Sequence, residues 1–281
     1  MVQRVYEIAG IRLRVCIPAA WMYPHDGALE EFVSDSDHWD RSLVFEVTDT
    51  LAPPEGQRVY HSPAQQIYRL DDGQIRYEGV VANALGGAYV RMERHGVNST
   101  VQVQKGAITH GITPKLVLKA MEAEHLICDA GGFLLHASWI DVGGKGILFT
   151  GPSGVGKSTQ AALWCDYRGA ELINGDRAAV FTDHVRGIPF RGSSGVGKNR
   201  RTDLAAIIYL TQAPETTLTR LTGARAFRRL WEGCSVNIWN QADIERTTAA
   251  VMSTLAAVPV YHLACRKDET AIEALEKEWI V

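Results

Sequence analysis

A short glycine-rich segment, Gly151–Ser158, has the sequence Gly-Pro-Ser-Gly-Val-Gly-Lys-Ser. This spacing is typical of loops whose backbone N–H groups surround a chain of phosphates. Lys157 would add a cation for the outer phosphates, and Ser158 would offer a hydroxyl ligand to Mg²⁺. We therefore expect a magnesium-bound nucleoside triphosphate to bind at these positions: Gly151, Pro152, Ser153, Gly154, Val155, Gly156, Lys157, Ser158 and Thr159.

The residues on either side of this loop suit such a site. An apolar run, Gly146–Thr150, precedes the loop and predicts a strand, and Thr159–Trp164 continues it as a predicted helix. A helix that begins at the loop directs the positive end of its dipole toward a bound anion. The strand, the loop and the helix together favour a phosphate-binding function over a chance match.

A similar segment, Gly192–Asn199, lies further along the chain. It ends in Asn199 where a serine or threonine would be needed, and no apolar strand precedes it. We therefore do not interpret it as a second nucleotide site. Its cations (Lys198, Arg200 and Arg201) indicate either a plain surface loop or a mobile flap that closes over a substrate.

Phosphoryl transfer also needs a carboxylate beside the metal or the attacking hydroxyl. Asp176 ends the predicted strand Glu171–Ile173 within the sequence Asn-Gly-Asp, one helix after the phosphate loop. In a parallel sheet this position would lie beside the loop, where Asp176 could act as a base or hold Mg²⁺. The alternative is a turn aspartate. His136 lies in an apolar strand, so periodicity alone favours a buried core residue.

The elements that must position these residues fall into two regions. Alternating residues predict strands at 4–16 (with a break at Gly10), 42–47, 59–70, 75–79, 89–93 and 99–104. From residue 112 the pattern changes to alternating strands and helices, which is typical of an α/β layer. We predict a mainly β region over residues 1–112 and an α/β domain over 113–281. The latter has helices at 114–130, 157–167, 242–256 and 269–278, and strands at 133–142, 145–150, 171–173, 205–210 and 258–263.

Composition narrows the class of protein. The net charge of −3 provides no general basic field for nucleic acid. The five scattered cysteines form no CxxC pair, which argues against a disulfide framework or a thiolate zinc site. There is no signal-like apolar segment at the N-terminus and no apolar run long enough to span a membrane. We therefore expect a cytoplasmic protein without nucleic-acid or membrane partners.

Three segments together carry a family resemblance: His136–Asp141, the loop Gly151–Ser158, and Asn174–Asp176. Their order and intervals resemble the catalytic domain of bacterial HPr kinase/phosphorylase. The sequence is also similar to HPr-kinase-related proteins such as the lasso-peptide tailoring kinases. The resemblance implies the P-loop fold that this family shares with phosphoenolpyruvate carboxykinase, here preceded by a mainly β N-terminal region that is unlike the family's own. It also implies ATP and Mg²⁺ as ligands, and a homo-oligomer by analogy.

Carried over residue by residue, the resemblance assigns Lys157 to the phosphates and Ser158 to the metal. Asp176 corresponds to the aspartate that acts as base toward the substrate hydroxyl, and can also hold the metal. His136 corresponds to an active-site histidine, and Arg200 or its neighbour Arg201 to the mobile-loop arginine. Gly175 stands where the family has a first aspartate, and the family's metal-binding glutamate has no counterpart near residue 187. The sequence therefore does not establish whether the family's reverse, phosphorylase reaction exists here.

Our leading hypothesis is an ATP-dependent kinase that phosphorylates a hydroxyl group on a peptide or a small metabolite. The alternative is a nucleotide-binding regulatory or accessory protein without transfer chemistry, which Gly175 would favour. A carboxykinase acting on an oxo acid shares the fold but needs more metal ligands than this sequence offers. The sequence does not identify the acceptor or distinguish ATP from GTP.

Overall fold

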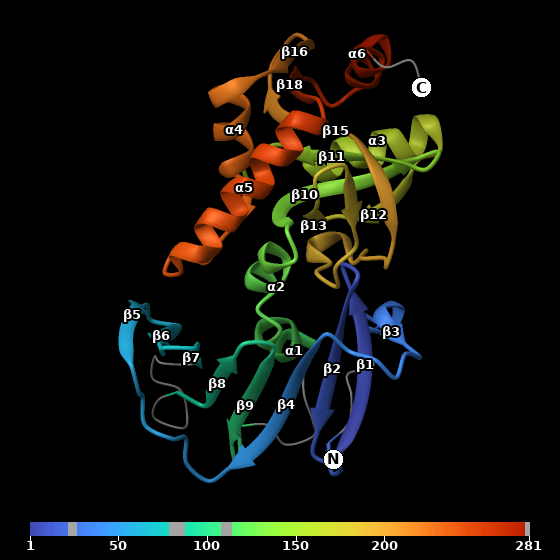
Figure 1. Ribbon diagram of the computed structural model, residues 1–281. Coiled ribbons are helices and arrows are strands. Elements are labelled where there is room, and N and C mark those ends of the chain that lie inside the picture. Colours follow the sequence, from blue (N-terminus) through green and yellow to red (C-terminus); the bar gives the residue numbers. More distant parts are fainter. Residues whose placement is uncertain (22–26, 79–87, 108–113, 279–281) are drawn as a thin grey trace. The chain divides into compact units, whose positions relative to one another are not determined.

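The computed structural model describes residues 1–21, 27–78, 88–107 and 114–278 of the chain (Figure 1). It is a mixed α/β structure with two large β-sheets and, in these ranges, six α-helices. The chain forms two compact units, Met1–Glu122 and Ala123–Val281. The predicted boundary between residues 112 and 113 lies outside the described residues. No helix in the ranges above is both long and apolar enough to cross a lipid bilayer.

The first unit is built on one nine-stranded sheet. Its strands are β1 (Val2–Ile8), β2 (Ile11–Ile17), β3 (Val33–Ser34), β4 (Arg41–Thr48), β5 (Gln57–His61), β6 (Gln65–Arg69), β7 (Gly73–Glu78), β8 (Val90–His95) and β9 (Asn98–Gln104). They lie in the order β3-β1-β2-β4-β9-β8-β7-β6-β5. The predicted hairpin is confirmed, because β1 and β2 pair in antiparallel fashion. Ala9 and Gly10 both adopt positive φ in its turn. The strands predicted near 42–47, 89–93 and 99–104 are also confirmed.

The predicted strand 59–70 is wrong, because β5 and β6 are two strands separated by a turn. Ser62 Oγ accepts hydrogen bonds from the backbone N–H groups of Ala64 (3.3 Å) and Gln65 (3.2 Å). Pro63 has no N–H group to contribute to a β-ladder. This local turn chemistry overrides the alternating pattern.

The second unit contains another nine-stranded sheet. Its strands are β10 (Phe133–Val142), β11 (Lys145–Thr150), β12 (Glu171–Asn174), β13 (Arg177–Val180), β14 (His184–Arg186), β15 (Arg201–Gln212), β16 (Thr217–Leu221), β17 (Cys234–Ser235) and β18 (Val260–Cys265). The main order is β11-β10-β13-β14-β15-β18-β16, and β11 also pairs with β15 in parallel. β10 is antiparallel to β11, β12 and β13, so the sheet is mixed rather than parallel.

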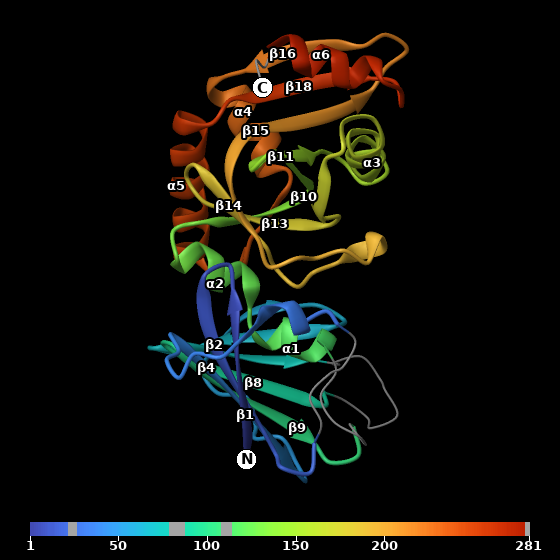
Figure 2. The ribbon, with the colours of Figure 1, turned by 90° about the vertical axis from the view of Figure 1, so that its right-hand side faces the viewer.

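Helices cover both faces of this second sheet. The helices among the described residues are α1 (Pro114–Ala120), α2 (Ala123–Asp129), α3 (Lys157–Arg168), α4 (Gly223–Trp231), α5 (Gln241–Ala257) and α6 (Thr270–Glu278). One apolar cluster joins Trp164 of α3 and Ile272 of α6 to Phe149 of the sheet. The other joins Leu230 of α4 and Val251 of α5 to the sheet's opposite face. Figure 2 shows α3 and α5 on opposite sides of the strands.

The helix predicted over residues 114–130 is wrong in one respect, because it is divided into α1 and α2. The division falls at Glu122, which has a positive φ of 47°. The Glu122 carboxylate accepts hydrogen bonds from Gln74 and from Arg94 (2.7 Å). These contacts hold Glu122 in a conformation that a continuous helix would not allow, so tertiary contacts override the helical pattern.

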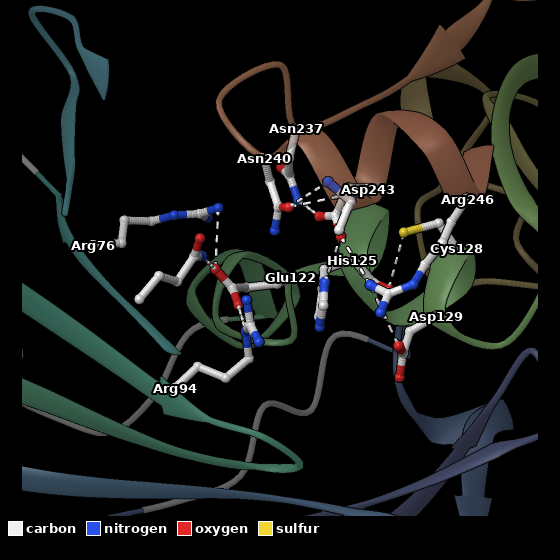
Figure 3. Close-up of polar contacts among 12 residues, drawn as sticks. Arg76, Arg94, Glu122, His125, Cys128, Asp129, Asn237, Asn240, Asp243 and Arg246 are labelled. Atoms are coloured by element: carbon white, nitrogen blue, oxygen red, sulfur yellow. Dashed lines mark hydrogen bonds and ion pairs between the residues drawn. The ribbon is translucent and has the colours of Figure 1, made fainter. Parts of the chain in front are cut away.

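A buried polar network joins α2 to α5 within the second unit (Figure 3). Asp243, only 1% exposed, receives contacts from His125 Nδ1 (2.9 Å) and Asn237 Nδ2 (2.9 Å). Burial alone would raise the pKa of Asp243, but these hydrogen bonds outweigh it and lower the pKa. His125, Cys128 and Asp243 lie close enough to hold a metal, yet the Arg246 guanidinium lies 3.6 Å from Asp243 and opposes a cation there. The network therefore stabilises the fold.

We expect Asp243→Ala to lower the free energy of unfolding by about 3 kcal/mol, because it leaves His125 and Asn237 buried without their acceptor. Chemical denaturation of the full chain measures the change. Glu245→Ala, an exposed position on the same helix, is the control and should change stability by less than about 0.5 kcal/mol. Equal effects of the two substitutions would contradict the structural role of Asp243.

Candidate functional site

The pairing of strands in the second sheet places the glycine-rich loop and Asp176 on either side of the same residue of β10. Ala137 of β10 pairs with Thr150, the last residue of β11, on one side. On its other side, the Ala137 N–H donates to the Asp176 carbonyl oxygen at 3.0 Å. The loop after Thr150 and the Asp176 position therefore flank β10 at one point along its length. The prediction placed Asp176 beside the loop in a parallel sheet, but the intervening strand is antiparallel.

Asp176 lies in a two-residue bend between the end of β12 and the start of β13, close to the strand end at which the sequence placed it. β12 and β13 pair with successive parts of β10 in nearly constant register, and Gly175 and Asp176 form the bend between them. The Asn174 Oδ1 atom accepts from the backbone N–H groups of Asp176 (2.9 Å) and Arg177 (3.0 Å). The Asn-Gly-Asp bend expected from the sequence is thus made by the Asn174 side chain.

The loop between β11 and α3 has an unusual backbone. Gly151, Gly154 and Gly156 have φ values of 139°, 76° and 115°, which residues with a side chain rarely adopt. α3 begins directly after Gly156, and this N-cap residue has no side chain to cap the first turn. The N–H groups at a helix start need acceptors, so this terminus is suited to an anion. The strand–loop–helix arrangement expected from the sequence is present.

Lys157 is the first residue of α3 and is only 7% exposed. Its Nζ donates to the carbonyl oxygens of Gly151 (3.1 Å) and Pro152 (3.2 Å), so the ammonium group lies within the loop. Burial lowers the pKa of Lys157, whereas the carboxylate of Asp176 opposes that shift. An anionic ligand in the loop would attract the ammonium group more strongly than these neutral carbonyl oxygens do.

His136 and Asp176 come together across β10 and β13. The His136 Nε2 atom lies 3.5 Å from Asp176 Oδ1, and Arg177 Nε lies 3.5 Å from Asp176 Oδ2. Burial lowers the pKa of His136 and the charge of Lys157 lowers it further, whereas the Asp176 carboxylate opposes the shift; the net lowering favours the neutral imidazole. Periodicity predicted a core histidine, but the side chain of His136 is 42% exposed and borders a cavity.

One cavity of about 540 Å³ collects these groups. It is lined by His136, Gly151, Pro152, Ser153, Asp176, Arg177, Tyr209, Glu232, Gly233, Cys234 and Ser235. The segment Gly233–Ser235 reaches this position because its backbone continues alongside β10 where β11 has ended, with Gly233 accepting from the His136 N–H at 2.8 Å. The cavity therefore brings the acidic Asp176 and the basic Arg177 next to the glycine-rich loop.

Sequence reasoning missed Arg177, Tyr209 and Glu232 as lining residues. The position of Arg177 next to Asp176 was the only feature of the sequence that could have pointed to it. The Arg177 guanidinium also lies 3.6 Å from the Glu124 carboxylate. Tyr209 donates a hydrogen bond to Glu232 at 3.2 Å. Glu232 follows α4, which the sequence did not predict, so nothing in the sequence brought it to the site.

Other predicted residues lie outside this lining. Gly154 to Thr159 continue the loop into α3, and Ser158 is exposed there. Arg200 is exposed and lies 3.5 Å from Glu171, so the structure does not bring it to the cavity in this conformation. Lys198 pairs with the same Glu171 at 2.5 Å. The cationic loop is therefore held by acidic Glu171 at the start of β12.

The second glycine-rich segment packs against the bend at residues 174–176. A side chain at Gly175 would overlap the Cβ and Oγ atoms of Ser194. A side chain at Gly192 would approach the side chain of Asp176. Glycine at 175 is thus a steric requirement of this packing.

We expect Gly175→Asp to destabilise the protein by about 1–3 kcal/mol, because the new Cβ displaces the Ser194 segment. Thermal denaturation of the variant measures this loss. The double variant Gly175→Asp with Ser194→Gly should recover part of it, since glycine removes the overlapping atoms. A fully stable single variant would show that the 192–194 segment does not pack on Gly175.

Comparisons with known proteins give little further information. No protein-family model matches the chain, and no curated protein matches it. Among solved structures, the HPr(Ser) kinase/phosphatase from Coxiella burnetii is similar with a TM-score of 0.29 and 12% sequence identity. The match covers 52% of this chain and 95% of that one. Likeness at this level carries no argument, so the geometry of the site must support any function.

Proposed function

We propose that the protein transfers the γ-phosphoryl group of Mg-ATP to a hydroxyl group of an acceptor. One observation carries the proposal: a single cavity borders the glycine-rich loop, the carboxylate of Asp176, the imidazole of His136 and the guanidinium of Arg177. Phosphoryl transfer needs anion-binding donors and a carboxylate close together, with little covalent chemistry from the protein.

The loop suits the triphosphate of this proposal. Its three glycines adopt positive φ, and the N-cap residue Gly156 has no side chain to cap the N–H groups in the first turn of α3. Among the described residues, Lys157 donates to the neutral carbonyl oxygens of Gly151 and Pro152 and to no carboxylate, so its ammonium group is available to a phosphate. Ser158 would hold Mg²⁺. When bound, the ion would neutralise charge on the phosphates.

Asp176 would serve as the base toward the acceptor hydroxyl. Its carboxylate is 28% exposed and faces the cavity, where an acceptor can approach. Neutral His136 can donate its Nε2 proton toward Asp176 Oδ1 and so hold the carboxylate in place. Arg177 adds positive charge beside the position of the transferring group, which would stabilise its negative charge.

The direct test is a transfer assay with the purified full chain, Mg²⁺ and ATP labelled at the γ-phosphate. A panel of hydroxyl-bearing peptides and metabolites serves as acceptors. We expect label to appear on an acceptor hydroxyl, mapped by mass spectrometry. A protein that binds Mg-ATP with ordinary affinity but labels nothing across the panel would contradict the proposal.

The alternative is a nucleotide-binding regulatory protein that transfers no phosphate. The steric exclusion of a second carboxylate at Gly175 favours it, because the resemblance expects an aspartate there. Under this alternative, nucleotide binding would change the stability or partner binding of the chain without a phosphorylated product. The assay above separates the two functions.

A further inference from the structure

A row of arginines follows one face of α4. Arg228 and Arg229 follow Arg225 by three and four residues, so each is a neighbour of Arg225 on the helix surface. They border a hollow of about 240 Å³ whose other lining residues are Leu221, Ala224 and His262. In a chain with a net charge of −3, this is a concentrated positive surface. We call it the arginine groove.

The cations of the groove are only partly neutralised. Arg229 donates to Glu232 at 3.1 Å, but no ion pair to a carboxylate within the described residues engages Arg225 or Arg228, and both are exposed. Burial lowers the pKa of His262, and the charges of Arg229 and Arg225 lower it further. The groove therefore repels a further positive charge and suits an anion. Arginine is the side chain best shaped to bind carboxylates with two parallel hydrogen bonds.

The arginine groove adjoins the cavity that holds Asp176. Tyr209 and Glu232 line that cavity, and Arg229 lines the groove. These three residues contact one another: the Arg229 guanidinium lies 4.7 Å above the Tyr209 ring and donates to the Tyr209 hydroxyl at 3.3 Å. The two hollows are thus separated by one layer of side chains.

The length of this path limits what can occupy both hollows. Arg225 and Glu232 are two turns of helix apart, or about 10 Å at the rise of an α-helix. An extended peptide advances roughly 3.3–3.6 Å per residue, so about three residues would cover that length. A short hydroxy acid could reach one hollow but not both.

We propose that the arginine groove binds the carboxylates of an acidic peptide whose hydroxyl residue lies in the adjoining cavity. The aspartates or glutamates would stand about two to four residues from the hydroxyl residue. Arg225 and Arg228 would pair with them, while Arg229 remains bound to Glu232. This inference rests on the proposed function for the role of the hydroxyl, and the groove itself rests on charge and geometry alone.

Binding is measured by fluorescence anisotropy with labelled peptides of equal length, each with one serine and a run of aspartates, asparagines or lysines about three residues away. We expect the aspartate peptide to bind most tightly at low salt and to weaken as salt screens the charges. Arg225→Glu with Arg228→Glu should weaken its binding about tenfold or more and reverse the preference toward the lysine peptide. Reversal cannot arise from misfolding.

Arg220→Glu is the matched control. It adds negative charge on β16, where alternation places Arg220 on the opposite face from Leu221 of the groove. This variant should keep the preference for the aspartate peptide. Equal binding of the aspartate and asparagine peptides, or an unchanged preference in the double variant, would overturn the inference.

The same peptides separate this inference from the proposed function. Aspartate peptides that bind through Arg225 and Arg228 but never receive phosphate from Mg-ATP would support the groove and contradict the kinase. Phosphate transferred equally to aspartate and asparagine peptides, by wild type and double variant alike, would support the kinase and overturn the groove.

Discussion

Lys157→Met is expected to weaken Mg-ATP binding by about a hundredfold or more. Methionine keeps the length of the side chain but removes the ammonium group that lies between the carbonyl oxygens of Gly151 and Pro152. At a site 7% exposed, water does not replace the lost charge, so the triphosphate loses a charge-assisted partner. Isothermal titration calorimetry with Mg-ATP measures the change in affinity.

Lys145→Met provides the control for this experiment. Lys145 begins the same strand, β11, that ends at the loop, and it is exposed with an ion pair to Asp203 at 3.4 Å. Its replacement removes the same charge from the chain and should leave the affinity for Mg-ATP unchanged. If Lys157→Met bound Mg-ATP as tightly as Lys145→Met, the loop would not be the phosphate site.

The sequence predicted the local parts of this site well. The glycines, Lys157 and the following helix are set by near neighbours, and short-range spacing identified them. Turn chemistry was equally local, since the Asn174 side chain makes the bend that presents Asp176. Such features depend on a few adjacent residues, so they can be predicted from a single sequence.

Long-range features were not predictable in the same way. The antiparallel β10 between β11 and β12 depends on pairings among residues far apart in the chain, which strand patterns do not specify. The contact of Ser194 with Gly175 is invisible until the two segments pack. α4 was missed because its arginines leave only Ala226 and Leu230 buried, a weak apolar face. Glu232 and the arginine groove were missed with it.

Asp176→Asn is expected to separate binding from transfer. The asparagine keeps the shape of the side chain and the bend at Asn174, but it cannot accept a proton from the acceptor hydroxyl. Loss of a general base typically costs about 10²–10⁴-fold in rate, and we expect a fall of that size in phosphate transfer. The affinity for Mg-ATP should stay within about threefold of wild type, because Lys157 and the loop amides are unchanged.

The comparison that isolates the carboxylate of Asp176 uses Asp166→Asn, which makes the same change at an exposed position on α3. That control should transfer phosphate at the wild-type rate. The decisive result is the ratio of the two rates at saturating Mg-ATP, since saturation removes any difference in affinity. Equal rates would mean that Asp176 does not take the proton, and that its position between His136 and Arg177 at 3.5 Å serves only to anchor the bend.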